Sequence, residues 1–585
     1  MSDNIKFFCL VEGDSKEEAF EVEIEKKKSV SFLKEKIKEK LHPDFENVAT
    51  KKIVLWKVNV PSGDDTMEVN VTLSDIQDKL KLSNPTKIIN EVFTENVTDD
   101  FIKIIIERPS EFINENLVNL WNALKNTKLN KQDEFLHLSG GTSFLGDLNI
   151  LYIRKCYREL LEIVFDENIK RLRITGNPGI GKSIFTYYIL YKLAQRNKTI
   201  VYNHLGHTFI IFEKEKAIYV DKSVIRTYIH NPDVWYIIDA TEPEKVEAKT
   251  ILVCSPRKDH YRNFDKYVGA KIRYMPIWSR EEIETCREKI FNHLKPEKVY
   301  DLFSKWGGIP RFVLEKAQDP CQQRLLEEAI VKNSDKRIFK FVGETDSSDD
   351  MSHMLLHIHT NIPDKVNDIR TSYIEKFLLF ASEYVSKRVI DALIENHRKD
   401  LERFVISSSS INEFGALRGY VFEDIAHRIL QKGGRFNIRL LDSDSTSSTI
   451  EFPKRDKLVF NKINEIKEGM YCQPKSKNFG SIDAIVAPDI LFQMTVSSNQ
   501  KNKKNKKKIK NPISINGLKN LADKLGGESE KKYINFYFVL PKDKYNNFGK
   551  QNFHNKNNTV SKTIPTWITN RIRQYALEID TISKL

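Results

Sequence analysis

A glycine-rich segment has residue types and spacing that can bind a triphosphate. It fits the pattern G-x-x-x-x-G-K-S/T, between a short apolar strand pattern and a helical pattern. Its glycines let backbone N–H groups point at phosphate oxygens, and a helix N-terminus adds partial positive charge there. Lys182 is expected to reach the β- and γ-phosphates, and the Ser183 hydroxyl to bind Mg²⁺. The predicted nucleotide-binding residues of this loop are Gly176, Asn177, Pro178, Gly179, Ile180, Gly181, Lys182 and Ser183.

Three further residues are expected near the phosphates. An apolar run predicts a buried strand that ends at Asp239, which would hold the magnesium through water. Ser255 follows the next predicted strand, at the edge where a parallel sheet binds ligands. Arg311 follows two glycines and a proline and is expected to read the γ-phosphate, although a plain interhelical turn explains it equally well. Because Ala240 stands where many ATPases carry a glutamate, the sequence supports binding better than fast hydrolysis.

A second set of polar residues indicates phosphodiester chemistry. A helix is expected around Glu423, a strand after Asp483, and a paired strand with Gln493 and Thr495 on one face. Two carboxylates at Glu423 and Asp483 would hold Mg²⁺ at a scissile phosphate. The order fits the restriction-endonuclease pattern E…D…E/Q-x-K, except that Thr495 replaces the lysine. An active Mg²⁺-dependent DNA endonuclease and an inactive fold that binds DNA or protein both stay open.

A run of seven lysines follows within residues 501–510. These side chains would neutralise phosphates, or serve as a nuclear import signal, or form a solvated loop. The proximity to the second polar set favours nucleic acid, and so does the net charge of +13. The lysines expected to take part are Lys503, Lys504, Lys506, Lys507, Lys508 and Lys510.

Length and composition set the wider frame. A chain of 585 residues exceeds one core, so three or four domains are expected. Six cysteines lie far apart without a C-x-x-C pair, which argues against disulfides and zinc fingers. The sequence shows no secretory signal segment and no membrane-spanning segment.

The N-terminal elements are expected to form a ubiquitin-like β-grasp. Apolar alternation and helical spacing predict a hairpin, a helix, a strand, a short helix and a last strand. Their expected ranges are 4–12 with 19–25, 30–41, 53–58, near 74–82, and 101–106.

Three N-terminal stretches, residues 6–13, 55–58 and 102–109, resemble the N-terminal domain of the Crinkler effectors of oomycetes and fungi. Residues 135–145 are similar to the joint before the P-loop domain in fungal members. The resemblance implies delivery into a host cell, with an effector module that often acts in the nucleus. It also implies a restriction-endonuclease-like domain after the NTPase, with the second polar set at matching positions.

The expected fold class is therefore a multidomain α/β protein. Its predicted parts are a ubiquitin-like N-terminal domain (1–109), a helical linker (110–149), a P-loop NTPase of the AAA+/STAND kind (150–340), a linker with a helical connector (341–405), and a PD-(D/E)XK nuclease-like domain (406–585).

The predicted function is that of a secreted, translocated effector that binds ATP or GTP with Mg²⁺ and acts on host nuclear DNA. The alternative is a catalytically inactive effector, controlled by nucleotide, that binds DNA or protein and modulates host immunity or development. Expected partners are the nucleotide, DNA, host nuclear proteins and further copies of the chain, without a membrane.

Overall fold

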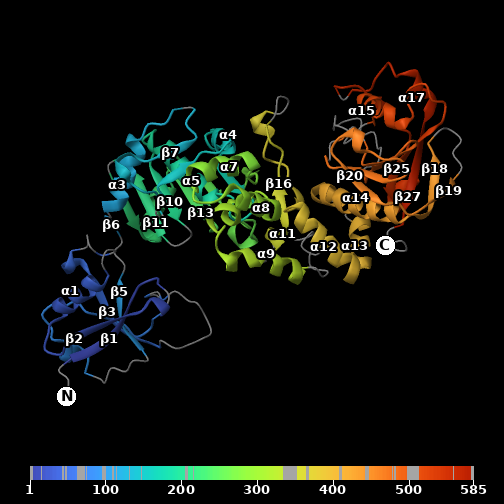
Figure 1. Ribbon diagram of the computed structural model, residues 1–585. Helices are drawn as coiled ribbons and strands as arrows, with labels where there is room; N and C mark the ends of the chain where they lie inside the picture. The colour runs from blue at the N-terminus through green and yellow to red at the C-terminus, as the bar shows by residue number, and fades with distance from the viewer. Residues whose placement is uncertain are drawn as a thin grey trace. The chain divides into compact units, whose positions relative to one another are not determined.

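The computed structural model shows a mixed α/β protein with several separate sheets (Figure 1). It describes residues 4–14, 16–41, 45, 49–61, 71, 73, 76–94, 101–107, 111–113, 115–130, 132–145, 148–204, 208–214, 216–333, 352–363, 368–407, 412–441, 447–476, 479, 482–496, 513–557 and 559–580.

The N-terminal part is a five-stranded sheet with a helix packed against it. The strand order is β2-β1-β5-β3-β4, in which β1 and β5 are parallel and the other neighbours antiparallel. Helix α1 (Val30–Lys40) begins after Ser29, whose hydroxyl accepts a hydrogen bond from the Phe32 N–H, and buries Leu33 and Ile37. The strands are β1 (Asn4–Val11), β2 (Phe20–Glu25), β3 (Val54–Pro61), β4 (Leu80–Lys81) and β5 (Phe101–Glu107).

One N-terminal prediction is wrong. The short helix expected near residues 74–82 is replaced over its last part by strand β4, which pairs with β3 at Trp56↔Lys81. The Leu82 N–H also donates to the Leu55 carbonyl at 2.8 Å. Pairing with a neighbouring strand therefore overrides the local spacing, and the short helix α2 (Ile89–Val92) comes later.

A central eight-stranded sheet carries the glycine-rich loop. Its order is β15-β9-β14-β13-β10-β11-β12-β6; the first five strands are parallel and the last three antiparallel. Strand β13 (Trp235–Asp239) is buried at every position, as expected for a strand covered on both faces. The other strands are β6 (Glu111–Ile113), β9 (Arg171–Thr175), β10 (Ile200–His204), β11 (Thr208–Glu213), β12 (Lys216–Val220), β14 (Lys249–Val253) and β15 (Ala270–Tyr274).

The predicted helical linker 110–149 is not a separate helical connector. Its strand β6 pairs with β12 and so completes the central sheet. Helix α3 (Glu115–Asn126) lies along this sheet, where the Trp121 indole N–H donates to the Lys214 carbonyl at 2.8 Å. Two short strands then pair, β7 (Phe135–His137) and β8 (Ile150–Tyr152). Helices α4 (Lys155–Val164), α5 (Lys182–Ala194) and α6 (Lys222–Ile229) complete this part.

Contacts group the chain into two compact units. One contains Met1–Gly176 with Gly181–Met275, and the other contains Asn177–Ile180 with Pro276–Leu585. This division differs from the predicted NTPase boundary at residue 340. It also assigns four residues of the glycine-rich loop to the second unit.

The second unit begins with a helical part. Here the predicted connector 341–405 contains a strand pair besides helices, β16 (Leu356–His359) antiparallel to β17 (Phe377–Phe380). The acidic linker expected at residues 344–350 lies outside the described residues. The helices are α7 (Arg280–Lys289), α8 (Pro296–Trp306), the π-helix η7 (Arg311–Glu315), α9 (Pro320–Asn333), α11 (Ser352–Leu355), α12 (Glu383–Asn396) and α13 (Arg398–Ser407).

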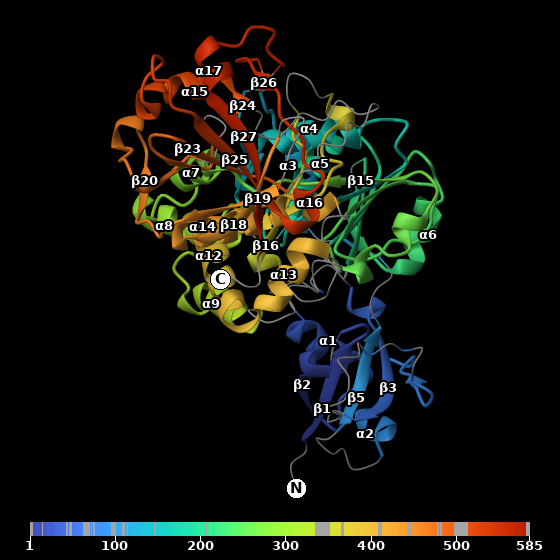
Figure 2. The same ribbon diagram turned by 90° about the vertical axis from the view of Figure 1, so that its right-hand side faces the viewer.

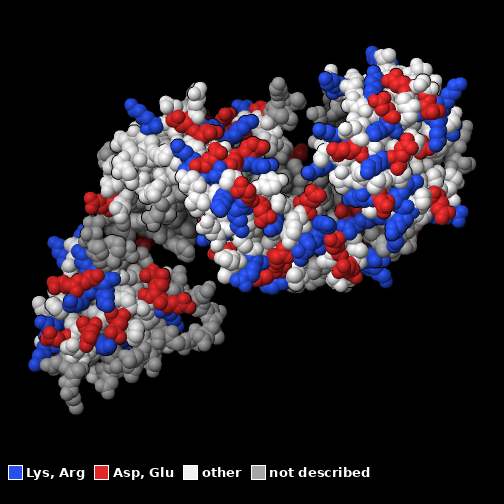
Figure 3. Space-filling view, in the orientation of Figure 1, with Lys and Arg blue, Asp and Glu red and all other residues white. Residues whose placement is uncertain are grey.

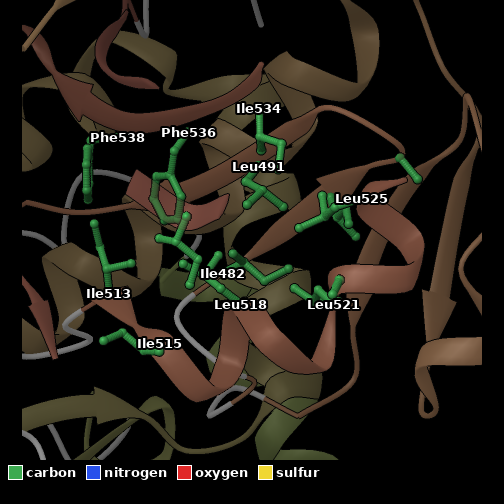
Figure 4. Close-up of a cluster of buried hydrophobic side chains, with 14 of the residues drawn as sticks. Ile482, Leu491, Ile513, Ile515, Leu518, Leu521, Leu525, Ile534, Phe536 and Phe538 are labelled. Carbon is green, nitrogen blue, oxygen red and sulfur yellow. The ribbon is translucent and has the colours of Figure 1, made fainter. Parts of the chain in front are cut away.

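The C-terminal part is a second eight-stranded sheet between helices (Figure 2). Its order is β19-β18-β27-β25-β23-β22-β21-β20. Helix α15 (Ile515–Asn520) packs its Ile515 and Leu518 against Leu491 and Phe536 in one core (Figure 4). The strands are β18 (Gly434–Leu440), β19 (Ser447–Phe452), β20 (Lys457–Phe460), β21 (Tyr471–Pro474), β22 (Ala484–Val486), β23 (Ile490–Met494), β25 (Ile534–Pro541) and β27 (Ile572–Ile579).

Helix α14 (Gly415–Lys432) lies against the opposite face of this sheet. Its His427 hydrogen-bonds the Tyr471 hydroxyl at 2.7 Å, and the Tyr471 ring contacts that of Phe492. The alternation of side chains along a strand explains the arrangement, since Leu491 and Phe492 must face opposite ways. The predicted apolar stripe of this helix is buried, including Leu417 and Ile425.

Candidate functional site

The glycine-rich loop joins β9 to α5 through backbone conformations that favour glycine. The φ angles are 155° at Gly176, 78° at Gly179 and 92° at Gly181. A Cβ at Gly181 would lie 2.5 Å from the hydroxyl oxygen of Tyr157. That hydroxyl donates a hydrogen bond to the Gly181 carbonyl at 2.6 Å. The loop therefore has the sharp turn that the sequence pattern predicts, with α5 beginning at Lys182.

Lys182 and Asp239 form the charged centre of this loop. The Lys182 ammonium is buried and donates to the Gly176 carbonyl at 2.9 Å. Asp239 is only 3% exposed, and burial raises the pKa of its carboxyl, against the opposing effects of the Ser183 hydrogen bond and the Lys182 charge. Its Oδ2 atom has no hydrogen-bond partner among the described residues.

These groups fit a magnesium–triphosphate ligand. An acceptor-only carboxylate with a buried, unpartnered oxygen beside a serine hydroxyl is the donor set that Mg²⁺ prefers. Lys182 would supply positive charge to the phosphates once released from the Gly176 carbonyl. The residues of the loop therefore fit a magnesium–triphosphate ligand, in which Ser183 and Asp239 would bind the magnesium.

The loop tip is held by second-unit residues. The Arg311 N–H donates to the Gly179 carbonyl at 3.4 Å, and the Trp278 indole N–H donates to the Ile180 carbonyl at 2.8 Å. A Cβ at Gly179 would lie 2.9 Å from that of Arg311. Arg311 thus touches the loop backbone, on the first turn of a π-helix, a feature frequent at functional sites.

Ser255 lies past β14, the strand between β9 and β13. Its hydroxyl is 3.4 Å from the Nδ1 atom of His260. The carboxyl ends of parallel strands share one edge of a sheet, so Ser255 lies at the same edge as Asp239 and the loop. Nothing in the sequence near Ser255 indicates the histidine contact.

Ala240 and Glu242 stand where a catalytic glutamate would be expected. Ala240 has a φ of 68°, and its N–H donates to the Val253 carbonyl at 2.9 Å. Glu242 caps a short turn: its carboxylate accepts from the N–H groups of Asn263 and Phe264. Glu242 is thereby engaged, so the geometry favours nucleotide binding over rapid hydrolysis.

The C-terminal carboxylates influence each other. Asp483 is half-buried, and its Oδ2 accepts a hydrogen bond from the Met494 N–H at 2.6 Å. Burial and the negative charge of Glu423 on α14 raise the pKa of Asp483 to about 7. Two carboxylates that repel each other form a pair that a cation would relieve. Among the described residues, however, no three His, Cys, Asp or Glu side chains gather as a metal-binding group.

Gln493 lies on β23 and follows Phe492, the partner of Ala484 at the end of the paired register. The Asp483 N–H donates to the Phe492 carbonyl at 2.8 Å, so the predicted pairing of Asp483 with Gln493 does not continue this register. Gln493 is 4% exposed. Thr495 follows the strand, and its N–H donates to the Val539 carbonyl at 3.0 Å.

Two aromatic residues behind the carboxylates were missed by sequence reasoning. His427, one helical turn after Glu423, is buried, and its Nε2 atom lies 4.0 Å from the Glu423 carboxylate. Burial lowers the pKa of His427 to about 3. Tyr471 is fully buried, and burial followed by the charges of Asp483 and Glu423 raises its pKa well above the usual value. A lone histidine on an apolar stripe gives no sequence signal of such a contact.

The lysine run predicted to bind nucleic acid, Lys503 to Lys510, lies outside the described residues. Elsewhere basic and acidic side chains intermingle on the face that Figure 3 shows. No helix in the described part of the chain has the length and apolar character of a membrane span.

A central sheet with a phosphate-type loop, and a second sheet with a carboxylate pair, define a multidomain α/β protein. Residues 5–107 match the family model of the Crinkler effector protein N-terminal domain. These residues are thus similar to the N-terminal domain of Crinkler effector proteins.

Three relatives carry the same family name. Crinkler effector proteins 15 and 16 of Phytophthora infestans are each 26% identical, over 380 and 386 residues. Each match covers 59% of this chain and 58% of the relative, which is less than two thirds of its length. Crinkler effector protein 1 of Rhizophagus irregularis is 27% identical over 117 residues, 20% of this chain and 24% of that protein.

Solved structures give a much weaker likeness. AMPPCP-bound DnaA from Aquifex aeolicus and the replication initiator DnaA bound to AMPPCP and single-stranded DNA are both 12% identical, with TM-scores of 0.22. They cover 48% of this chain and 91% and 89% of those chains. At this TM-score the likeness carries no argument about ligand or mechanism.

Proposed function

We propose that this chain is an effector, secreted and delivered into a host cell, that binds ATP or GTP with Mg²⁺ at the loop Gly176–Ser183. The observation that carries the proposal is the buried Lys182 ammonium at the turn of the loop, 2.9 Å from the Gly176 carbonyl, with the buried Asp239 carboxylate at the end of β13. In this proposal the N-terminal sheet is a ubiquitin-like β-grasp, and the central sheet is an NTPase of the AAA+/STAND kind. Effector delivery is proposed from the similarity of residues 5–107 to the Crinkler effector protein N-terminal domain.

The C-terminal part is proposed to act on DNA in the host nucleus. Residues 415–585 contain 31 Lys and Arg against 16 Asp and Glu, whereas residues 1–107 contain 16 Lys and 22 Asp and Glu. The basic excess of the chain is therefore concentrated in the C-terminal part, which should attract a polyanion. Glu423 and Asp483 would share a Mg²⁺ ion whose other ligands are water and phosphate oxygens, as is usual for this metal.

A second candidate is a nuclease-like domain that binds DNA or host nuclear proteins without cutting. Thr495 favours it, because a threonine supplies no positive charge at the position where the pattern has a lysine. In this second candidate, nucleotide bound at the glycine-rich loop still controls which partner the C-terminal domain binds. It could equally control whether copies of the chain associate.

Nucleotide binding is tested by calorimetry on the purified full chain with ATP, GTP and Mg²⁺. We expect Lys182→Ala to weaken binding at least about tenfold, because one charge-assisted contact to phosphate is lost. Lys198→Ala is the matched control, since Lys198 is exposed. If wild type binds neither nucleotide, the nucleotide function is wrong.

DNA cleavage is tested by nicking of supercoiled plasmid with Mg²⁺ and with Mn²⁺, in the presence and absence of ATP. The nuclease reading expects nicking by wild type and at least about a hundredfold loss in Asp483→Ala. Asp489→Ala is the control, since Asp489 lies in the turn of the same hairpin. Intact plasmid with wild type, together with retained DNA binding, would favour the second candidate.

A further inference from the structure

One side chain of the glycine-rich loop is bound to a strand about 180 residues further along the chain. Asn177 is 0% exposed, and its Nδ2 atom donates to the carbonyls of His353 at 3.1 Å and Leu356 at 3.2 Å. Its Oδ1 atom accepts the Ile358 N–H at 2.7 Å. Asn177 therefore uses both ends of its amide to fix the beginning of β16. All these residues belong to the second unit.

Strand β16 passes this connection to β17. The two strands pair antiparallel from Leu356↔Phe380 to His359↔Phe377. The Ala381 N–H, directly after β17, donates to the Leu355 carbonyl at 2.8 Å. A shift of β16 would break these bonds in a buried place, so the pair should move as one piece.

Strand β17 in turn contacts the helix that carries Glu423. The Phe380 ring lies edge-on to the Tyr420 ring of α14, with centroids 6.0 Å apart. The Tyr420 hydroxyl is 3.0 Å from the Ser386 hydroxyl at the start of α12. Tyr420 precedes Glu423 by three residues, so both lie on neighbouring positions of one helix face.

We propose that nucleotide binding is relayed from Asn177 through β16 and β17 to α14, and so regulates the carboxylate pair Glu423 and Asp483. The inference rests on the proposed function of both sites. Binding a triphosphate requires the loop N–H groups to converge on phosphate oxygens, which repositions the Asn177 backbone. Two buried hydrogen bonds to β16, and a third to His353 just before it, make that strand follow, because leaving them unmade is costly.

The engagement of Glu242 makes the relay a switch with a long-lived bound state. Since Glu242 is held by the N–H groups of Asn263 and Phe264, it is not placed to activate water, and slow hydrolysis would let bound ATP persist. The state of β16 then reports whether nucleotide is present, rather than the passage of a hydrolytic cycle.

The test is hydrogen–deuterium exchange on the full chain, with and without the non-hydrolysable analogue AMPPNP and Mg²⁺. In wild type we expect the analogue to change amide exchange at least about tenfold in residues 356–359, 377–380 and 421–426. Asn177→Ala removes the side-chain bonds to His353, Leu356 and Ile358, and it is compared with wild type at an analogue concentration that saturates the variant. In that variant all three responses should disappear.

Glu375→Ala is the control, because Glu375 is exposed just before β17; it should respond as wild type does. Tyr420→Leu removes the ring that contacts Phe380, and so breaks the relay further along if Asn177→Ala does not fold. This variant should keep the response at residues 356–359 and lose at least about threefold of that at residues 421–426.

The outcomes separate the relay from the proposed function. If wild type binds AMPPNP and both Asn177→Ala and Tyr420→Leu respond like wild type, the relay is wrong and nucleotide binding stands. If wild type binds the analogue without any response at residues 356–359, the relay is also wrong. If wild type binds no nucleotide, the proposed function and the relay fall together.

Discussion

At Gly181 a single hydrogen atom in place of a side chain keeps the loop in its shape. Two separate effects act there, a φ of 92° and a Tyr157 hydroxyl oxygen 2.5 Å from where a Cβ would stand. The sequence pattern identifies this glycine as part of a phosphate loop, but it contains no sign of Tyr157, which lies 24 residues earlier. The two effects can be measured apart.

We expect Gly181→Ala to lower the free energy of unfolding by about 2–4 kcal/mol, from the strained φ and the overlap with Tyr157. Tyr157→Phe removes the hydroxyl, so the double variant should recover part of the loss. Urea denaturation of the two single variants and the double variant measures the coupling. Additive losses would contradict the overlap at this position.

At the scale of the elements, Arg418 joins helix α14 to the rest of the C-terminal part. Arg418 is 2% exposed, and its Nη2 atom donates to both carboxylate oxygens of Asp543, at 2.9 and 3.0 Å. Its Nη1 atom donates to the Val496 carbonyl at 3.2 Å, just after β23. One guanidinium thus orders the helix of Glu423 against the strand of Gln493.

We expect Arg418→Leu to cost about 3–5 kcal/mol of stability, since it leaves Asp543 without its main partner in a mostly buried place. Asp543→Asn keeps the oxygen acceptor and should cost less. Arg435→Leu is the control, because Arg435 is exposed. Chemical denaturation followed by tryptophan fluorescence gives the comparison, and equal losses at positions 418 and 435 would contradict it.

The sequence predicts elements well where the signal is local. The β1–β2 hairpin, α1 and the strand before the glycine-rich loop have the expected type, because alternation and helical spacing are visible within a few residues. The helix expected near residues 74–82 fails because its pairing partner, β3, lies about 25 residues earlier. The partners of Asn177 and Glu423 are long-range contacts, which no local pattern contains.

For the whole molecule, stability in acid depends on buried histidines. His357 is 0% exposed, and neither ring nitrogen hydrogen-bonds within the described part of the chain. Burial, with smaller effects of His359 and His353, lowers the pKa of His357 to about 3; burial likewise lowers that of His359 to about 4. At a pH between the lowered pKa of the folded state and the ordinary histidine pKa of the unfolded chain, the folded state therefore binds fewer protons than the unfolded chain.

Because an unfolded histidine takes up a proton below pH 6.5, stability is fully present above that pH and falls as the pH drops toward 3. For His357 the loss at pH 5 is about 2 kcal/mol. His357→Leu should reduce the fall in Tm between pH 7.5 and pH 5 by about 4 °C in calorimetry. His230→Leu, at an exposed site, is the control; an unchanged fall in both variants would contradict the assignment.

The bond between Asn177 and Ile358 also bears on how the protein is made. The ribosome completes the glycine-rich loop long before it adds residue 358, so during synthesis the loop waits without the partners of its buried amide. A nascent chain stopped near residue 275 should therefore bind nucleotide poorly. Binding should rise once the strand pair β16–β17 has left the ribosome. Ligand recognition would then come late in biogenesis, after the strand pair β16–β17 has been made.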